Sequence, residues 1–275
     1  DYDLSQNEKI VIVGNPPYND TTSIIRNSIK QEQEIDSTIK TRDLGMSFLL
    51  SYSKLNADYI CVLHPLSYLI KESNFKVLNE FTKNYKLIDC EIISSQEFTD
   101  KVSSTFFPII IALYKRGEKM DYGFIKNYNF KVKNKTFKIS KFDTIGNYIT
   151  KYPNQKFLKE SEAVAKFYTM RDINALKRSQ TFMRETIRNT IFVRNDKLSY
   201  YCYVDIFKKF IPNIPYYYGN CDIMIDNEKF KKIENCFMNY SVEANREFSK
   251  YCKVENNYKE KVNEYFMELL GEHYV

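Results

Sequence analysis

Several features that define common protein classes are missing from this chain of 275 residues. It has no tryptophan and only two histidines, His64 and His273. Its six cysteines include no C-x-x-C pair, so the sequence predicts no structural zinc site and no other metal site. The longest apolar run is about nine residues. A membrane-spanning helix needs ~20, so we expect no membrane partner. No signal peptide is visible, and reduced thiols are typical of a cytoplasmic protein.

The charge is distributed unevenly along the chain. Residues 1–100 carry a net charge of −5, residues 101–200 carry +13, and residues 201–275 carry −2. A concentrated positive stretch is what neutralisation of phosphates requires. The sequence therefore predicts a nucleic-acid partner whose affinity falls steeply with salt.

The most informative motif is Asn15-Pro16-Pro17-Tyr18, directly after the apolar run 10–14. Four β-branched residues closed by glycine favour a strand that is buried on both faces of a parallel sheet. The motif then lies at the carboxyl end of that strand, where ligands of open α/β sheets bind. Each proline fixes its own φ, and Pro17 also restricts Pro16 to extended geometry.

The chemistry of this corner suits a planar amino group. The Asn15 side-chain oxygen and the Pro16 carbonyl are two neighbouring acceptors for an NH2 group. The Tyr18 ring offers a face on which the ring carrying that amine can stack. Fixed acceptors that favour a pyramidal nitrogen expose its lone pair, so catalysis by this corner needs no histidine.

The motif resembles the catalytic motif of S-adenosylmethionine-dependent amino-methyltransferases, above all the DNA adenine-N6 methyltransferases with Asn-Pro-Pro-Tyr. It is also similar to the motif of enzymes that methylate glutamine side chains. Three later segments resemble the DNA enzymes in order and spacing: 43–50 on a helix, the turn 64–69 after strand 59–63, and a late strand at 107–115 typical of the family's closing hairpin. Gly45 departs from the family's pattern, because glycine is unfavourable inside a helix.

The resemblance implies the fold and the mechanism. The fold is α/β: an incomplete Rossmann-like methyltransferase sheet in residues 1–150, followed by a smaller mixed α+β target-recognition domain in residues 151–275. The substrate is double-stranded DNA, the methyl donor is S-adenosylmethionine, and the target adenine is flipped out of the duplex. The resemblance also implies an aromatic side chain on the far face of the flipped base, and Phe124 or Phe130 could serve.

The cofactor site implied by the resemblance is largely missing. No G-x-G turn occurs among the 7 glycines. Asp1 or Asp3 could be a remnant of the acidic motif that contacts the adenine of the cofactor, although aspartates near a chain end are more often only solvated. We therefore expect the carboxyl-terminal part of a longer or split enzyme, with a missing segment or a separate chain that carries the glycine-rich cofactor motif.

The second domain has a less regular pattern. Spacing predicts a helix in 157–175, strands at 191–193 and 199–204, a turn at 212–219, and a helix in 254–270. Tyr216-Tyr217-Tyr218 is either a DNA-facing platform or the edge of a core. Aromatic residues alternate with a basic cluster that we expect to contact DNA, the alternative being a solvated basic helix face. The basic residues are Lys177, Arg178, Arg184, Arg188 and Arg194, and the aromatic residues are Phe182, Phe192, Tyr200, Tyr201 and Tyr203.

Four alternatives remain open from the sequence. A noncatalytic DNA-specificity subunit would bind duplex DNA without cofactor affinity. A protein-glutamine N5 methyltransferase would use the same corner, although it has no evident need for the basic middle of the chain. An RNA adenine methyltransferase would prefer RNA to duplex DNA. Cytosine N4 presents the same amino group to the same acceptors.

Overall fold

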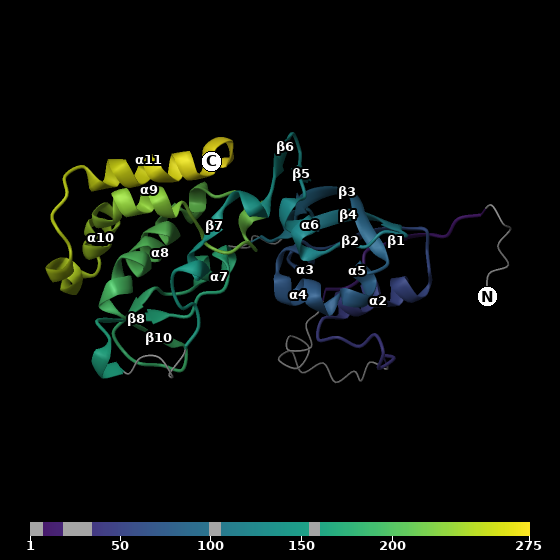
Figure 1. Ribbon diagram of the computed structural model, residues 1–275, viewed down its shortest axis with the longest axis horizontal. Helices are drawn as coiled ribbons and strands as arrows, with labels where there is room; N and C mark the ends of the chain where they lie inside the picture. The colour runs from purple at the N-terminus through teal and green to yellow at the C-terminus, as the bar shows by residue number, and fades with distance from the viewer. Residues whose placement is uncertain (1–7, 19–34, 99–105, 154–159) are drawn as a thin grey trace. The chain divides into compact units, whose positions relative to one another are not determined.

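The computed structural model describes residues 8–18, 35–98, 106–153 and 160–275, and the chain divides into two compact units, Asp1–Ser140 and Lys141–Val275 (Figure 1). Both units mix helices with small sheets, so the protein belongs to the mixed α/β class. Residues 141–150, which the sequence analysis assigned to the first domain, lie in the second unit. No helix in the described ranges is long and apolar enough to cross a membrane.

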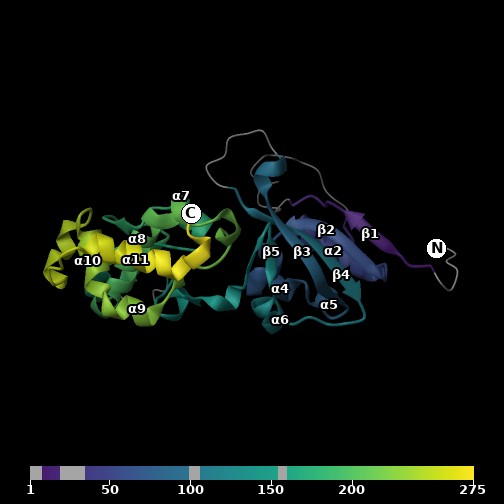
Figure 2. The same cartoon turned by 90° about the horizontal axis from the view of Figure 1, so that it is seen from above.

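A four-stranded sheet in the order β1-β2-β4-β3 forms the centre of the first unit, with β1 at one edge (Figure 2). β1 is parallel to β2, whereas β4 is antiparallel to both β2 and β3. β1, β2 and β3 therefore run in the same direction, and their carboxyl ends meet at one edge of the sheet. The strands are β1 (Val11–Gly14), β2 (Tyr59–Pro65), β3 (Tyr85–Ser94) and β4 (Pro108–Arg116).

Short helices lie on one face of this sheet (Figure 1). Ile60, Val62 and His64 of β2 are fully buried, whereas Tyr59, Cys61 and Leu63 between them are only half-buried. A short hairpin of β5 (Phe130–Val132) and β6 (Lys135–Phe137) follows the sheet. The helices are α2 (Leu44–Lys54), α3 (Ser67–Ile70), α4 (Glu72–Val77), α5 (Asn79–Thr82) and α6 (Tyr122–Asn127).

The expectation that the first strand is buried on both faces is wrong. Val11 is 56% exposed and Val13 is 77% exposed. Both side chains point to the same face because strand residues alternate, and β1 is an edge strand. An uninterrupted apolar run does not reveal whether its second face has a partner.

Two other parts of the first unit differ from the sequence pattern. Apolar residues from Phe75 to Tyr85 recur at helical spacing and predict one helix, but the structure has two short helices there, α4 and α5, that meet at Leu78. From residue 122 to 148, aromatic or apolar residues alternate with Lys and Asn, a pattern typical of edge strands. β5 and β6 lie in this stretch, but it begins with helix α6. Asp121 starts that helix by accepting a hydrogen bond from the Phe124 amide at 2.7 Å, which is a helix-capping interaction.

The second unit combines a helical core with two small sheets. β8 pairs with both β9 and β10 in antiparallel fashion, and β7 pairs with β11. Aromatic rings fill the core, where Tyr203 contacts Phe230, Phe237 and Phe266 with ring centroids 5.0 to 5.9 Å apart. The elements are β7 (Asp143–Thr144), β8 (Ala165–Tyr168), α7 (Ile173–Arg178), β9 (Phe182–Met183), β10 (Thr190–Val193), α8 (Leu198–Phe210), β11 (Met224–Ile225), α9 (Asn227–Lys232), α10 (Glu234–Val242) and α11 (Tyr258–Leu270).

Residues 199–204, expected as a strand, form the first half of α8. Every residue from Tyr200 to Phe207 is buried, and a helix buried on all sides lacks the polar stripe that separates helix from strand in a sequence. Residues 165–168, expected within a helix, form strand β8. The expected strand at 191–193 is confirmed as part of β10, and the expected carboxyl-terminal helix is confirmed from Tyr258 onward.

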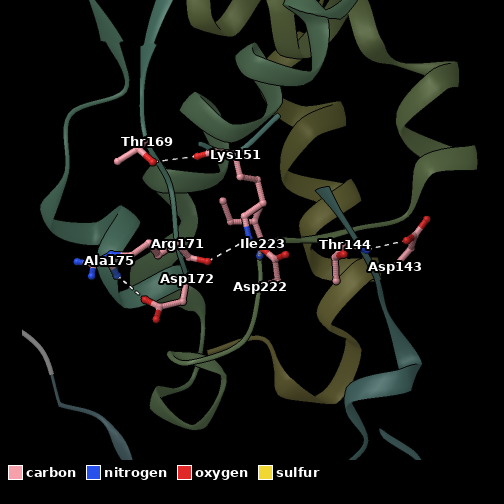
Figure 3. A network of polar contacts seen from close by, with 9 residues as sticks. All are labelled: Asp143, Thr144, Lys151, Thr169, Arg171, Asp172, Ala175, Asp222 and Ile223. Carbon is pink, nitrogen blue, oxygen red and sulfur yellow. Dashed lines mark hydrogen bonds and ion pairs between the residues drawn. The ribbon is translucent and has the colours of Figure 1, made fainter. Parts of the chain in front are cut away.

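A polar network connects the first residues of the second unit to its interior (Figure 3). The Lys151 ammonium donates to Asp222 at 2.6 Å and to the Arg171 carbonyl at 3.1 Å. The Lys151 carbonyl accepts the Thr169 hydroxyl at 3.0 Å. Together with the pairing of β7 with β11, these contacts explain why residues 141–150 belong to the second unit.

Candidate active site

Asn15, Pro16, Pro17 and Tyr18 follow β1 directly, at the edge where β1, β2 and β3 end. Pro16 is buried, Tyr18 is half-buried, and Asn15 and Pro17 are exposed. The Tyr18 hydroxyl donates a hydrogen bond to the Asn15 side-chain oxygen. Burial raises the pKa of Tyr18, so this phenol stays protonated and keeps its donor near neutral pH. The four residues therefore form one compact corner.

This corner retains hydrogen-bonding capacity for a ligand. An amide oxygen has two acceptor lone pairs, and the Tyr18 hydroxyl uses one of them. Because the Asn15 side chain is exposed, a donor from outside the protein can reach the remaining lone pair. The Tyr18 hydroxyl also fixes the orientation of the Asn15 amide, since only the oxygen can accept its proton.

Helix α2 packs directly against the corner at two glycines. A Cβ built on Gly14 would lie 3.2 Å from the Tyr52 hydroxyl of α2. A Cβ built on Gly45 would lie 3.2 Å from the Pro17 carbonyl oxygen and 2.5 Å from the Tyr68 hydroxyl. Gly45, unfavourable for helix formation by itself, is thus required by the close approach of the Pro17 backbone and the Tyr68 side chain.

Asp43 joins the start of α2 to the first turn after β2. It is the N-cap of α2, and its Oδ1 accepts the Gly45 amide at 2.9 Å. The same oxygen accepts the Tyr68 hydroxyl. Burial, followed by this carboxylate, raises the pKa of Tyr68, so Tyr68 remains a donor at every accessible pH.

His64 supports Tyr68 from within the sheet. The imidazole is fully buried and stacks on the Tyr68 ring at 5.3 Å with an interplanar angle of 9°. Its Nε2 lies 2.7 Å from the Tyr114 hydroxyl and its Nδ1 lies 3.0 Å from the Pro65 carbonyl. The carbonyl oxygen can only accept, so Nδ1 carries the proton and Nε2 accepts from Tyr114. Burial lowers the pKa of His64 to about 4, so the ring is neutral near pH 7.

Asp43, Gly45, Tyr68 and His64 lie in segments that resemble the DNA enzymes, but the sequence predicted no role for them at the corner. One signal was present: an aspartate directly before a helical apolar spacing is a typical N-cap. The contacts of Gly45 and Tyr68 had no signal, because they join parts of the chain that only the sheet brings together.

Four aromatic or acidic residues expected at the site have different outcomes. Asp1 and Asp3 lie outside the described residues. Phe130 is fully buried against Phe137 and Tyr128, so it cannot stack on a flipped base in this conformation. Phe124 is half-exposed, but it lies beneath the Lys86 ammonium at 5.3 Å, next to the first residues of β3. Asn15 is at the opposite end of the parallel strands, so the structure does not bring Phe124 to the corner.

The five expected basic residues are all exposed and all lie in the second unit. The register of the small sheet divides them. Arg184 follows β9 and Arg194 follows β10. β9 ends next to Lys166 and β10 ends next to Ala165, both at the start of β8, so these two side chains emerge at the same end of the sheet. Lys177 and Arg178 are the last residues of α7, ahead of β9, and Arg188 lies in the turn that leads into β10.

Most of the aromatic residues expected to contact DNA lie in the core. Tyr200, Tyr201 and Tyr203 are at most 5% exposed. Their hydroxyls bond to Asn227, the Thr150 carbonyl and the Met224 carbonyl, respectively. Tyr217 and Tyr218 are also buried, so Tyr216–Tyr218 is the edge of a core and not a platform. Phe182 and Phe192 remain half-exposed.

A hollow of about 480 Å³ lies next to Arg194 in the second unit. Phe192, Arg194, Asp196 and Lys197 line it together with residues 146–150. The Arg194 guanidinium pairs with Asp196 at 2.8 Å, but its side chain is 63% exposed. Among the residues the structure describes, this hollow combines cations with a half-exposed aromatic ring, the kind of side chains that contact nucleic acids.

No group of three or more histidine, cysteine, aspartate or glutamate side chains within the described ranges could hold a metal ion. Comparisons with protein-family models, with curated proteins and with solved structures gave no match for this chain. Function is therefore inferred from the geometry and chemistry of the residues themselves.

Proposed function

We propose that this protein transfers a methyl group from S-adenosylmethionine to the N6 amino group of a flipped adenine in DNA, as a DNA adenine-N6 methyltransferase of the Asn-Pro-Pro-Tyr type. The observation that carries the proposal is the corner Asn15–Tyr18 at the carboxyl end of β1, with the Asn15 amide oriented by the Tyr18 hydroxyl. The antiparallel β4 inserted between β2 and β3 supports it, since the resemblance implies a closing hairpin in an incomplete Rossmann-like sheet.

The residues of this chain hold the amine and orient its lone pair. The free lone pair of the Asn15 oxygen accepts one N6 hydrogen, and the Pro16 carbonyl accepts the other. During methyl transfer the N6 nitrogen would gain positive charge while the methyl–sulfur bond breaks and the sulfonium becomes a neutral thioether. Both acceptors would stabilise the charge on nitrogen without having to reorganise. The cation then loses a proton to water and leaves a neutral methylamino group. In this proposal the Tyr18 ring stacks on the base while its hydroxyl keeps Asn15 oriented.

When bound, S-adenosylmethionine supplies an electrophilic methyl group. The described residues do not form a cofactor site by themselves, because the chain has no G-x-G turn and Asp1 and Asp3 lie outside the described ranges. The exposed Val11 and Val13 on edge strand β1 support a further element at this position. We propose that a segment or separate chain adjoining β1 carries the rest of the cofactor site.

The second unit is proposed as the DNA target-recognition domain. Arg184 and Arg194 emerge at one end of the β10-β8-β9 sheet, and the hollow beside Arg194 exposes Phe192. Guanidinium groups suit phosphates and guanine edges, and an exposed ring can stack on an unpaired base. These features favour DNA over a purely protein substrate.

Asn15→Ala tests the proposal in the complete protein. Radiolabelled methyl transfer into duplex DNA of mixed sequence should fall at least about a hundredfold, the loss typical of removing one preorganised charge-stabilising group. Asn127→Ala is the matched control, since Asn127 is an exposed amide of α6 that donates to the Gly123 carbonyl and accepts the Ser140 hydroxyl. Near-wild-type transfer by Asn15→Ala would exclude the proposed role, and nucleoside analysis of the product separates N6-methyladenine from N4-methylcytosine.

The alternatives predict different results in the same assays. A noncatalytic specificity subunit binds duplex DNA but no S-adenosylmethionine, even with a partner chain that supplies the glycine-rich turn. A protein-glutamine N5 methyltransferase labels a protein and not DNA. An RNA enzyme is recognised by competition, because RNA then displaces duplex DNA from the protein.

A further inference from the structure

We propose that Tyr68, held by Asp43 and His64, is a positioning residue that fixes the Asn15–Tyr18 corner through Gly45 and Pro17. Tyr68 does not contact the base in this proposal, and acts only through the loop that does. The effect on catalysis rests on the proposed function, whereas the effect on the loop does not.

Asp43 is a hydrogen-bond acceptor shared by α2 and α3. Asp43 Oδ1 accepts both the Gly45 amide, at 2.9 Å, and the Tyr68 hydroxyl. Hydrogen bonds to a carboxylate are shorter and stronger than those between neutral groups. Asp43 is itself anchored, because the Thr41 hydroxyl donates to its carbonyl at 2.6 Å. The start of α2 and the side chain of α3 therefore move together.

Buried neighbours restrain the Tyr68 ring. Tyr68 is 2% exposed and stacks on His64, which is fully buried. His64 is held in turn by the Tyr114 hydroxyl at 2.7 Å and the Pro65 carbonyl at 3.0 Å. Strand residues in the centre of the sheet thus hold the Tyr68 hydroxyl in one position.

Gly45 connects the Tyr68 hydroxyl to the corner. A Cβ on Gly45 would meet the Tyr68 hydroxyl at 2.5 Å and the Pro17 carbonyl oxygen at 3.2 Å, so both groups already occupy the space above Gly45. The prolines have fixed φ angles, so a displacement of Pro17 is transmitted to the Pro16 carbonyl instead of being absorbed by rotation. Removing the Tyr68 hydroxyl opens space next to Pro17 and removes one of the two hydrogen bonds that Asp43 Oδ1 accepts.

Tyr68→Phe tests the proposal. The experiment records the side-chain NH2 signals of Asn15 in the 1H–15N spectrum of the full chain, assigned from Asn15→Ala. We expect these signals to shift or broaden in Tyr68→Phe. Tyr85→Phe is the matched control: Tyr85 is a fully buried tyrosine of the same unit whose hydroxyl donates to the Ala57 carbonyl at 2.9 Å, away from the corner. Asn15 signals that move no more in Tyr68→Phe than in Tyr85→Phe would overturn the proposal.

Methyl transfer provides the second measurement. In the complete protein, kcat should fall about tenfold to a hundredfold in Tyr68→Phe, the range expected from small misplacement of reacting groups. KM for DNA should stay unchanged, because no DNA contact is lost. Asp43→Asn, which keeps one acceptor oxygen, should lose less. Shifted Asn15 signals with unchanged kcat would overturn the positioning role. Shifted signals in a protein whose wild type methylates no nucleic acid would support the positioning of the corner and refute the proposed function.

Discussion

Gly45→Ala should destabilise the first unit even though alanine is the better helix former. Helix propensity alone favours alanine by ~1 kcal/mol in a helix interior. The new Cβ, however, would lie 2.5 Å from the Tyr68 hydroxyl and 3.3 Å from Tyr68 Cε2. Ordinary carbon–oxygen contacts are about 1 Å longer than the first of these distances, so the hydroxyl must move and its hydrogen bond to Asp43 must break.

The opposing free energies decide the sign. Overpacking a dense site costs about 1–3 kcal/mol, and losing a hydrogen bond to a charged group costs about 1.5–3 kcal/mol. Because both terms come from one displacement they do not add fully, and the propensity gain offsets part of them. We therefore expect a net loss of about 1–3 kcal/mol in the free energy of unfolding.

Native-state hydrogen exchange of the β2 amides measures this loss within the first unit, independently of the second. Gly123→Ala is the matched control, because its Cβ would meet only the Asp121 side chain, at 3.3 Å for the nearer atom. That variant should be neutral or slightly stabilised. A Gly45→Ala protein whose β2 amides exchange as slowly as in the wild type, or more slowly, would refute the packing described for Gly45, Tyr68 and Pro17.

Three further predictions concern pH, salt and the second unit. His64 has a pKa of about 4 in the folded state and 6.5 in the unfolded state, so between these values the unfolded state binds more protons and stability falls as the pH falls. The free energy of unfolding of the first unit should therefore fall by about 2 kcal/mol between pH 7 and pH 5. Hydrogen exchange of the β2 amides measures this loss, and His64→Gln should not show it. Replacing Arg184 and Arg194 by alanine should weaken duplex binding and reduce the slope of log K against log salt by about 2, whereas Arg246→Ala, an exposed arginine outside the basic tract, should leave the slope unchanged. In urea unfolding, Lys151→Ala should destabilise the second unit by about 2–3 kcal/mol, since its ion pair is largely buried. A loss below about 0.5 kcal/mol, typical of exposed pairs, would show that the network in Figure 3 is not required for stability.

The sequence predicted the alternating framework of the first unit well. β2, β3 and β4 lie where apolar runs were found, and α2 spans the residues with helical spacing. The prediction failed for the exposure of β1 and for α8, whose first half was expected as a strand. Both failures have one cause: an apolar run records that residues are compatible with burial, but not which elements cover them or on how many sides.

The candidate site was predicted in its motif and not in its support. Asn15 to Tyr18 was recognisable because adjacent residues carry the chemistry and two prolines fix the local backbone. The hydrogen bond from Tyr18 to Asn15 is also local, three residues apart. In contrast, two aromatic residues expected to contact DNA are buried in cores: Phe130, expected on the far face of the flipped base, and Tyr203, selected because it lies near basic residues. Composition gives the number of rings but not the direction in which they point.

The sequence by itself therefore determined the Asn15–Tyr18 corner, the order of β2, β3 and β4 in the first unit and the concentration of positive charge, because each depends on neighbouring residues or on composition. The tertiary structure decided which distant residues support that corner. Asp43 meets Tyr68 across 25 residues, and His64 meets Tyr114 across 50. Such contacts depend on strand pairing and helix packing, which place side chains together regardless of their separation in sequence. For the same reason, the need for glycine at position 45 is visible only in the fold, where Pro17 and Tyr68 occupy the space that a Cβ would fill.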